Sequence, residues 1–149
     1  GSIEVRILVA VDFSSVTDRV MDIARDLATR TASHVYVLHV AEPEPDFVGY
    51  DVGPDVVRDQ VAEEYHREHR QVQRLADSLR SSDVGATALL IQGSIVETII
   101  READRLDADL VVVGSHGHGA VFDLLVGSIS EGLVRRSSRP VLVVPPASS

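Results

Sequence analysis

The sequence has no cysteine, no tryptophan and no lysine, and these absences exclude several kinds of site. Without cysteine there can be no disulfide, no thiolate nucleophile and no cysteine-based zinc site. Aromatic residues make up only 4% of the chain, so aliphatic side chains must fill the core. This composition suits helices packed closely on a sheet.

All 14 basic residues are arginine, and the formal net charge is −9. Because an acidic surface repels nucleic-acid phosphates, we predict no nucleic-acid partner. No apolar run approaches the roughly 18 residues of a membrane span, and no basic segment with a long apolar run opens the sequence. We therefore predict no membrane insertion, no secretory signal and a cytoplasmic location. Two alternative explanations of the missing lysine stay open: adaptation to concentrated salt, and a lineage bias towards arginine.

Five short apolar runs alternate with helical patterns, which is typical of a parallel sheet covered by helices. The predicted strands are 3–11, 34–40, 86–92, 109–113 and 140–144. Between them, apolar spacings of three and four predict helices. Ser14 or Ser15 is expected to cap the first helix, Gly85 to end the second, Ser94 to cap the third, and residues 128–137 to form the last. We expect one domain, at residues 3–146.

A glycine-rich segment follows the fourth predicted strand and is the most informative part of the sequence. Gly114 and Gly117 open it, and Gly127 closes it just before a helix starts at Ser128. Glycine backbone can approach a phosphate closely, and the free amides of a helix N-terminus attract anions. The segment lacks both the P-loop and the dinucleotide fingerprint. Two interpretations remain open: a phosphate cradle, or a plain loop in which Ser128 and Glu131 form a capping box.

The spacing Gly114-x2-Gly117-x9-Gly127-Ser128 resembles the G-2x-G-9x-G-[S/T] motif of ATP-binding universal stress proteins. The opening strand that runs into Val11-Asp12-Phe13-Ser14, the segment HVYVLHV and the ending RPVLVVP are also similar to that family. The resemblance implies an α/β, Rossmann-like fold: an open, doubly wound, five-stranded parallel sheet of order 3-2-1-4-5 with helices on both faces. It also implies a homodimeric, stress-response regulatory protein that binds an adenine nucleotide such as ATP, with Mg²⁺ as a possible companion.

The resemblance further implies which residues contact the nucleotide. In family members the acidic residue after the first strand lies near the adenine, and this residue corresponds to Asp12. The backbone at the end of the second strand also contacts the adenine, and this position corresponds to Val40. Gly114 corresponds to the position beside the ribose. In the implied strand order, Asp12 and Gly114 follow the two strands between which the order reverses, where doubly wound sheets bind ligands. The general rule and the family motif therefore select the same place.

The phosphates, by the same resemblance, are held by Gly117, Gly127, Ser128 and Ile129. His116 is expected to lie near them and to make binding sensitive to pH. Ala10 stands where some ATP binders have proline, a difference that removes no hydrogen-bonding group. We assign no catalytic residue, because neighbours such as Ser115 and His116 seldom face each other in hydrogen-bonding geometry.

Other polar clusters favour structural interpretations. His116 and His118 are expected to be exposed loop residues, and His66 and His69 to lie on a solvated helix face, so we assign no metal ligands. Three arginines lie near the end of the last helix: Arg135, Arg136 and Arg139. Their positive charges are favourable near a helix C-terminus, which explains them without a bound ligand.

Two other functions compete with nucleotide-dependent regulation. One is a slow ATP hydrolase or phosphate-transfer enzyme, for which the sequence offers no evident general base. The other is a dimeric interaction protein with a vestigial pocket. Dimerisation itself is predicted through Val141–Val144, an apolar strand at one edge of the sheet. In the alternative, Pro145, Pro146 and the tail cover that edge and the chain is monomeric.

Overall fold

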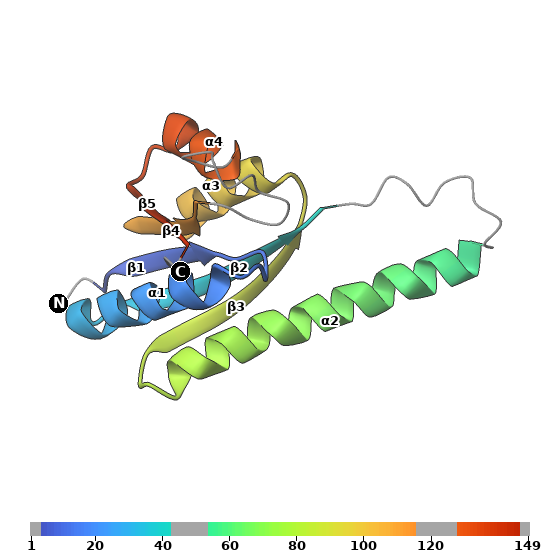
Figure 1. Cartoon of the computed structure of the whole chain (residues 1–149), viewed down its shortest axis with the longest axis horizontal. Coiled ribbons are helices and arrows are strands. Elements are labelled where there is room, and N and C mark those ends of the chain that lie inside the picture. Colours follow the sequence, from blue (N-terminus) through green and yellow to red (C-terminus); the bar gives the residue numbers. More distant parts are fainter. Residues whose placement is uncertain (1–3, 43–53, 116–127, 147–149) are drawn as a thin grey trace.

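The structure is a computed structural model that describes residues 4–42, 54–115 and 128–146 (Figure 1). In chain order the elements are β1 (Arg6–Ala10), α1 (Thr17–Thr31), β2 (His34–Ala41), α2 (Pro54–Arg80), β3 (Gly85–Gln92), α3 (Ile95–Arg105), β4 (Leu110–Gly114), α4 (Ser128–Arg136) and β5 (Val141–Val144). Every predicted strand is present, and the ends differ from the predicted ones by a few residues.

The five strands form one parallel sheet in the order β3-β2-β1-β4-β5, which confirms the predicted fold class. β1 lies at the centre, where Val9 faces Val37 of β2 and Val112 of β4. Its central residues are buried, and all are apolar, as expected of a strand covered on both faces.

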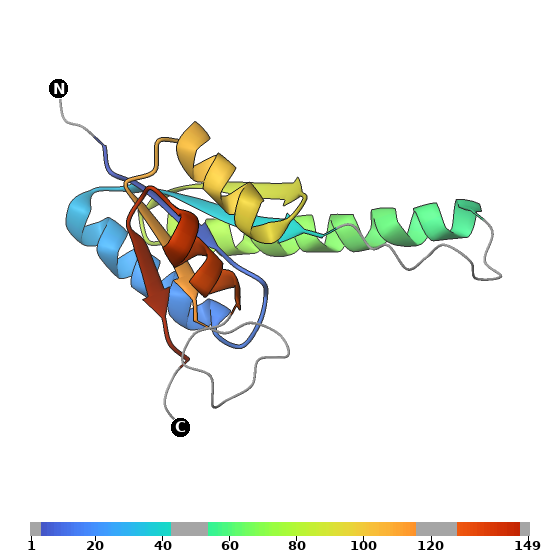
Figure 2. The ribbon, with the colours of Figure 1, turned by 90° about the horizontal axis from the view of Figure 1, so that it is seen from above.

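Helices cover both faces of the sheet, α1 and α2 on one and α3 and α4 on the other (Figures 1 and 2). On the first face Val9 packs in a cluster with Val20 of α1 and Val72 of α2. On the second face Leu8 packs with Ile99 of α3 and Leu133 of α4. The N-terminal part of α2 projects beyond the sheet in both views. Within the described ranges, no helix is long and apolar enough to cross a membrane.

The predicted end of α2 at Gly85 is wrong. The helix ends at Arg80, and Gly85 is the first residue of β3. Asp83 takes the left-handed conformation in between, with φ 62°, and the Val84 amide donates to the Leu79 carbonyl at 3.1 Å. The chain thus reverses without using a glycine, because aspartate tolerates this conformation better than most residues do.

The predicted side-chain cap of α1 is also wrong. Val16 occupies the cap position and makes no side-chain cap bond. Instead, the Asp12 carboxylate accepts the Ser14 amide at 2.9 Å, and the Ser14 carbonyl accepts the Thr17 amide at 3.1 Å. Ser94 does occupy the N-cap position of α3. Its side chain makes no cap bond, and its backbone carbonyl accepts the Thr98 amide. The turn that starts at Asp12 therefore replaces a hydroxyl cap.

Candidate functional site

The carboxyl ends of β1, β2 and β4 bring four predicted site residues to one end of the sheet. Ala10 ends β1, Val40 lies next to the end of β2, and Gly114 ends β4. Asp12 follows β1 two residues later. Since β1 pairs with β2 on one side and with β4 on the other, the strand order reverses here. A parallel sheet opens a crevice at such a point.

The start of α4 is anchored to the same end of the sheet by two buried serines. The Ser115 amide donates to the Val144 carbonyl of β5 at 2.8 Å, and the Ser130 hydroxyl donates to the Ser115 carbonyl at 3.2 Å. Ser128 and Ile129 begin this helix, with Ser128 exposed and Ile129 half-buried. Sequence reasoning missed the anchoring role of Ser115 and Ser130.

Three predicted site residues, His116, Gly117 and Gly127, lie outside the described residues. His118 does as well. Their assignment to the phosphates or to an exposed loop stays a prediction.

Asp12 sits in a tight turn that shapes the rim of the crevice. Its carboxylate is half-buried and accepts the Ser14 amide. Phe13, between the two, has a φ of 62°, a left-handed conformation that few bulky residues adopt. Its ring stacks on His39 of β2, with 4.3 Å between the ring centroids.

His39 is 9% exposed and is the feature of this region that sequence reasoning missed. Its Nδ1 lies 2.8 Å from the Val11 carbonyl oxygen, and its Nε2 contacts Glu68 of α2. A signal was available. A histidine inside an otherwise apolar strand, here HVYVLHV, requires polar partners once it is buried.

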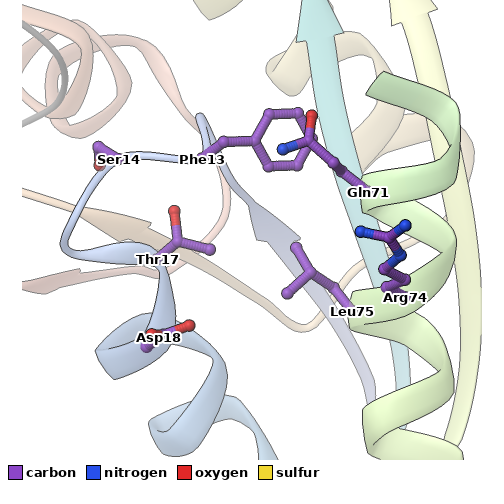
Figure 3. A pocket seen from close by; sticks show the side chains of 7 residues that line it. All are labelled: Phe13, Ser14, Thr17, Asp18, Gln71, Arg74 and Leu75. Atoms are coloured by element: carbon purple, nitrogen blue, oxygen red, sulfur yellow. The ribbon is translucent and has the colours of Figure 1, made fainter. Parts of the chain in front are cut away.

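A groove of about 310 Å³ lies between the start of α1 and α2, beside this turn (Figure 3). It is lined by Phe13, Ser14, Thr17, Asp18, Gln71, Arg74 and Leu75. The hydroxyls of Ser14 and Thr17 are buried and have no hydrogen-bond partner in the described part of the chain. None of the predicted nucleotide-contacting residues lines the groove, so it adjoins the predicted site without forming it.

The remaining polar clusters are structural or exposed. Arg139 bonds to Asp104 and Asp107, both at 3.1 Å, and these carboxylates raise the pKa of Arg139 above its ordinary value. Arg135 pairs with Glu131 at 2.9 Å. His66 and His69 are exposed on α2, as predicted. In the described ranges, no group of three or more metal-binding side chains is placed to hold an ion.

Comparison with known proteins agrees with this geometry. The sequence model of the universal stress protein family matches residues 5–145. The chain belongs to the universal stress protein family. A universal stress protein of Thermus aquaticus, from the 3′ region of a QAH/OAS sulfhydrylase gene, is 32% identical over 144 residues, which cover 93% of this chain and 96% of the relative.

Solved structures show the same universal stress protein fold. Protein MJ0577 of Methanocaldococcus jannaschii superposes with a TM-score of 0.81 at 24% identity, covering 99% of this chain and 100% of that one. A universal stress protein crystallised in complex with cAMP superposes with a TM-score of 0.72 at 24% identity, covering 98% and 100% of the two chains.

Proposed function

We propose that this universal stress protein binds an adenine nucleotide at the carboxyl ends of β1, β2 and β4 and acts as a stress-response regulatory module. The observation that carries the proposal is the meeting of Asp12, Gly114 and the start of α4 at the point where the strand order reverses. The neighbour solved with cAMP supports an adenine nucleotide as the ligand class.

The described residues offer groups that could contact the base, the ribose and the phosphates of an adenine nucleotide. Asp12 offers a half-buried carboxylate, and Val40 its backbone at the end of β2, for the base, while Gly114 would lie beside the ribose. Ala10 borders the base and contributes no polar group. The exposed Ser128 and the first amides of α4 suit phosphate oxygens, because a helix N-terminus carries unpaired N–H groups and a positive dipole end.

The glycines of the motif complete the proposed cradle. Gly117 and Gly127 would let the backbone approach the phosphates, with Ile129 beside them and His116 in reach of their charge. Bound ATP would bring a polyphosphate, and Mg²⁺ would neutralise part of its charge. The arginine-only composition is compatible with such a site, since backbone amides replace the lysine of other phosphate loops.

ATP binding is testable by calorimetric titration and by thermal unfolding. A ligand that binds only the folded state raises the unfolding midpoint, so millimolar ATP should raise it here. Ser128→Ala should weaken ATP binding by about tenfold, the usual effect of one lost hydrogen bond to a charged group. Ser138→Ala, an exposed serine beyond α4, is the matched control and should bind as the unaltered protein does. No heat and no midpoint shift with millimolar ATP would contradict the proposal.

We also propose that the protein acts as a homodimer joined through β5. In the described chain β5 pairs only with β4, so one edge of an apolar strand is open. The Pro145 carbonyl accepts from Arg19 of α1 at 2.9 Å, which directs the chain after β5 towards α1. Pairing of two β5 strands would satisfy their free amides and give a closed two-fold interface.

A further inference from the structure

His39 joins three elements through one buried imidazole. From its place in β2 it faces α1 and α2, on the same side as Val37. Nδ1 contacts the Val11 carbonyl after β1 at 2.8 Å, and Nε2 contacts the Glu68 carboxylate of α2. The side chain of His39 is 11% exposed and that of Glu68 is 17% exposed, so water has little access to either.

These contacts require a proton between the two side chains. The Val11 carbonyl only accepts hydrogen bonds, so Nδ1 of His39 must donate to it. Nε2 and the Glu68 carboxylate can then bond only if one proton lies between them, carried by the imidazole or by the carboxyl group. When that proton leaves, two lone pairs face each other across this contact, and the pair repels.

The position of the His39–Glu68 pair links it to the proposed nucleotide site. Val11 immediately precedes Asp12, and His39 immediately precedes Val40. Phe13, which follows Asp12, stacks on the His39 ring. The imidazole therefore holds the ends of both strands that carry the proposed adenine contacts.

We propose that the His39–Glu68 pair is a proton-dependent positioning pair for Asp12 and Val40, and that loss of its proton lowers nucleotide affinity. This inference rests on the proposed function. Affinity is highest at acidic pH, where the proton is held. It falls as the pH rises, because the ring loses its bond to Glu68 and the end of β2 separates from α2. The negative charge left behind also disfavours binding of an anionic nucleotide.

Few other charges face this pair. One turn earlier on α2, Glu64 is engaged by Arg67, and the Tyr65 hydroxyl donates to the Leu90 carbonyl at 3.4 Å. On β3, the register partner of His39 is the apolar Leu90. Asp12 is the charged group on the β1 side. Asp18 of α1 and Arg74 of α2 line the groove together with Phe13 (Figure 3).

The substitution Glu68→Gln separates proton dependence from simple structural support. A glutamine amide donates N–H to Nε2 of a neutral imidazole, so the link survives without a titrating proton. ATP affinity is measured by calorimetry in both proteins from about pH 5 to about pH 9. Over this rise in pH we expect the affinity of the unaltered protein to fall by about tenfold more than the affinity of Glu68→Gln does. Comparing the two proteins cancels the titration of ATP and of His116, which both share.

Two further variants complete the experiment. Glu64→Gln removes a carboxylate one turn away on the exposed face and should keep the pH profile of the unaltered protein. Glu68→Ala removes the link altogether and should bind ATP weakly at every pH. In the nucleotide-free protein, the ring ¹⁵N shifts of His39 should show a proton on Nδ1, and the pH dependence of the Nε2 signal should differ between the unaltered protein and Glu68→Gln.

The outcomes separate this inference from the proposed function. If the unaltered protein binds no ATP at any pH, the proposed function fails, and the role of the pair in affinity fails with it. If ATP binds but the unaltered protein and Glu68→Gln have the same pH profile, only the positioning role is overturned.

Discussion

Buried polar side chains set the geometry at the carboxyl end of the sheet. Ser115 and Ser130 are buried, and their bonds join β4, β5 and α4 at one point. His39 does the same for β1, β2 and α2. Because an unpaired polar group is costly in the interior, such bonds favour one arrangement of the elements over its neighbours.

Ser130→Ala should destabilise the fold by about 1–2 kcal/mol, since it leaves the buried Ser115 carbonyl without this donor. It should also weaken ATP binding, because the start of α4 loses an anchor. Chemical denaturation with calorimetry would measure both effects. Ser138→Ala, in an exposed position, should alter neither. A Ser130→Ala protein with unchanged stability would show that the hydrogen bond does not anchor the helix.

The helices end and begin through backbone geometry more than through side-chain caps. The N-cap residue of α1, Val16, makes no side-chain cap bond. Its C-cap residue, Ala32, takes the left-handed conformation, with φ 51° and ψ 53°. The Ala32 amide donates back to the Ala28 carbonyl, as in a regular C-terminal cap. Glycine is the usual residue at this position, and alanine is strained there.

Ala32→Gly should therefore stabilise the protein by about 0.5–1 kcal/mol, since glycine adopts this conformation without the steric penalty of a Cβ atom. Urea denaturation would measure the change in the free energy of unfolding. Ala62→Gly, within α2 and exposed, is the matched control and should destabilise by about 1 kcal/mol. Equal destabilisation by both substitutions would rule out strain at Ala32.

The two edges of the sheet differ from each other. Each edge strand has one partner in the described chain: β3, with eight residues, pairs with β2 and packs against α2, whereas β5, with four apolar residues, pairs with β4. An apolar edge of this kind favours pairing with another strand. The proposed homodimer follows from this asymmetry.

Light scattering coupled to size exclusion should give the mass of two chains at tens of micromolar. Val143→Lys should shift the protein towards one chain, because it places a charge in the proposed interface. Val134→Lys, on the exposed face of α4, is the control and should leave the mass unchanged. Circular dichroism would verify that both variants fold, since Val143 also packs partly against the second core cluster. A mass of one chain for the unaltered protein would end the proposal.

The helices and strands, and their order along the chain, could be predicted because the sequence patterns that indicate them are local. Alternating apolar runs and helical spacings identified every strand and helix, and the resemblance to a family supplied the sheet order that the structure confirms. The placement of Ala10, Asp12, Val40 and Gly114 followed, since carboxyl ends of parallel strands meet at one edge. The extent of a single domain at residues 3–146 stays a prediction.

By itself, the sequence determined which segments form strands, which form helices and where a glycine motif resembling that of ATP-binding relatives lies, since each depends on residues close together in the chain. Only the tertiary structure decided that Asp12 closes the turn before α1, that Asp83 takes the left-handed position after α2, and that His39 meets Glu68. The last contact joins residues 29 positions apart. It depends on how α2 crosses the sheet, which is set by the packing of Val72, Ala76 and Leu79 against the first core cluster and leaves no mark in any short stretch of sequence.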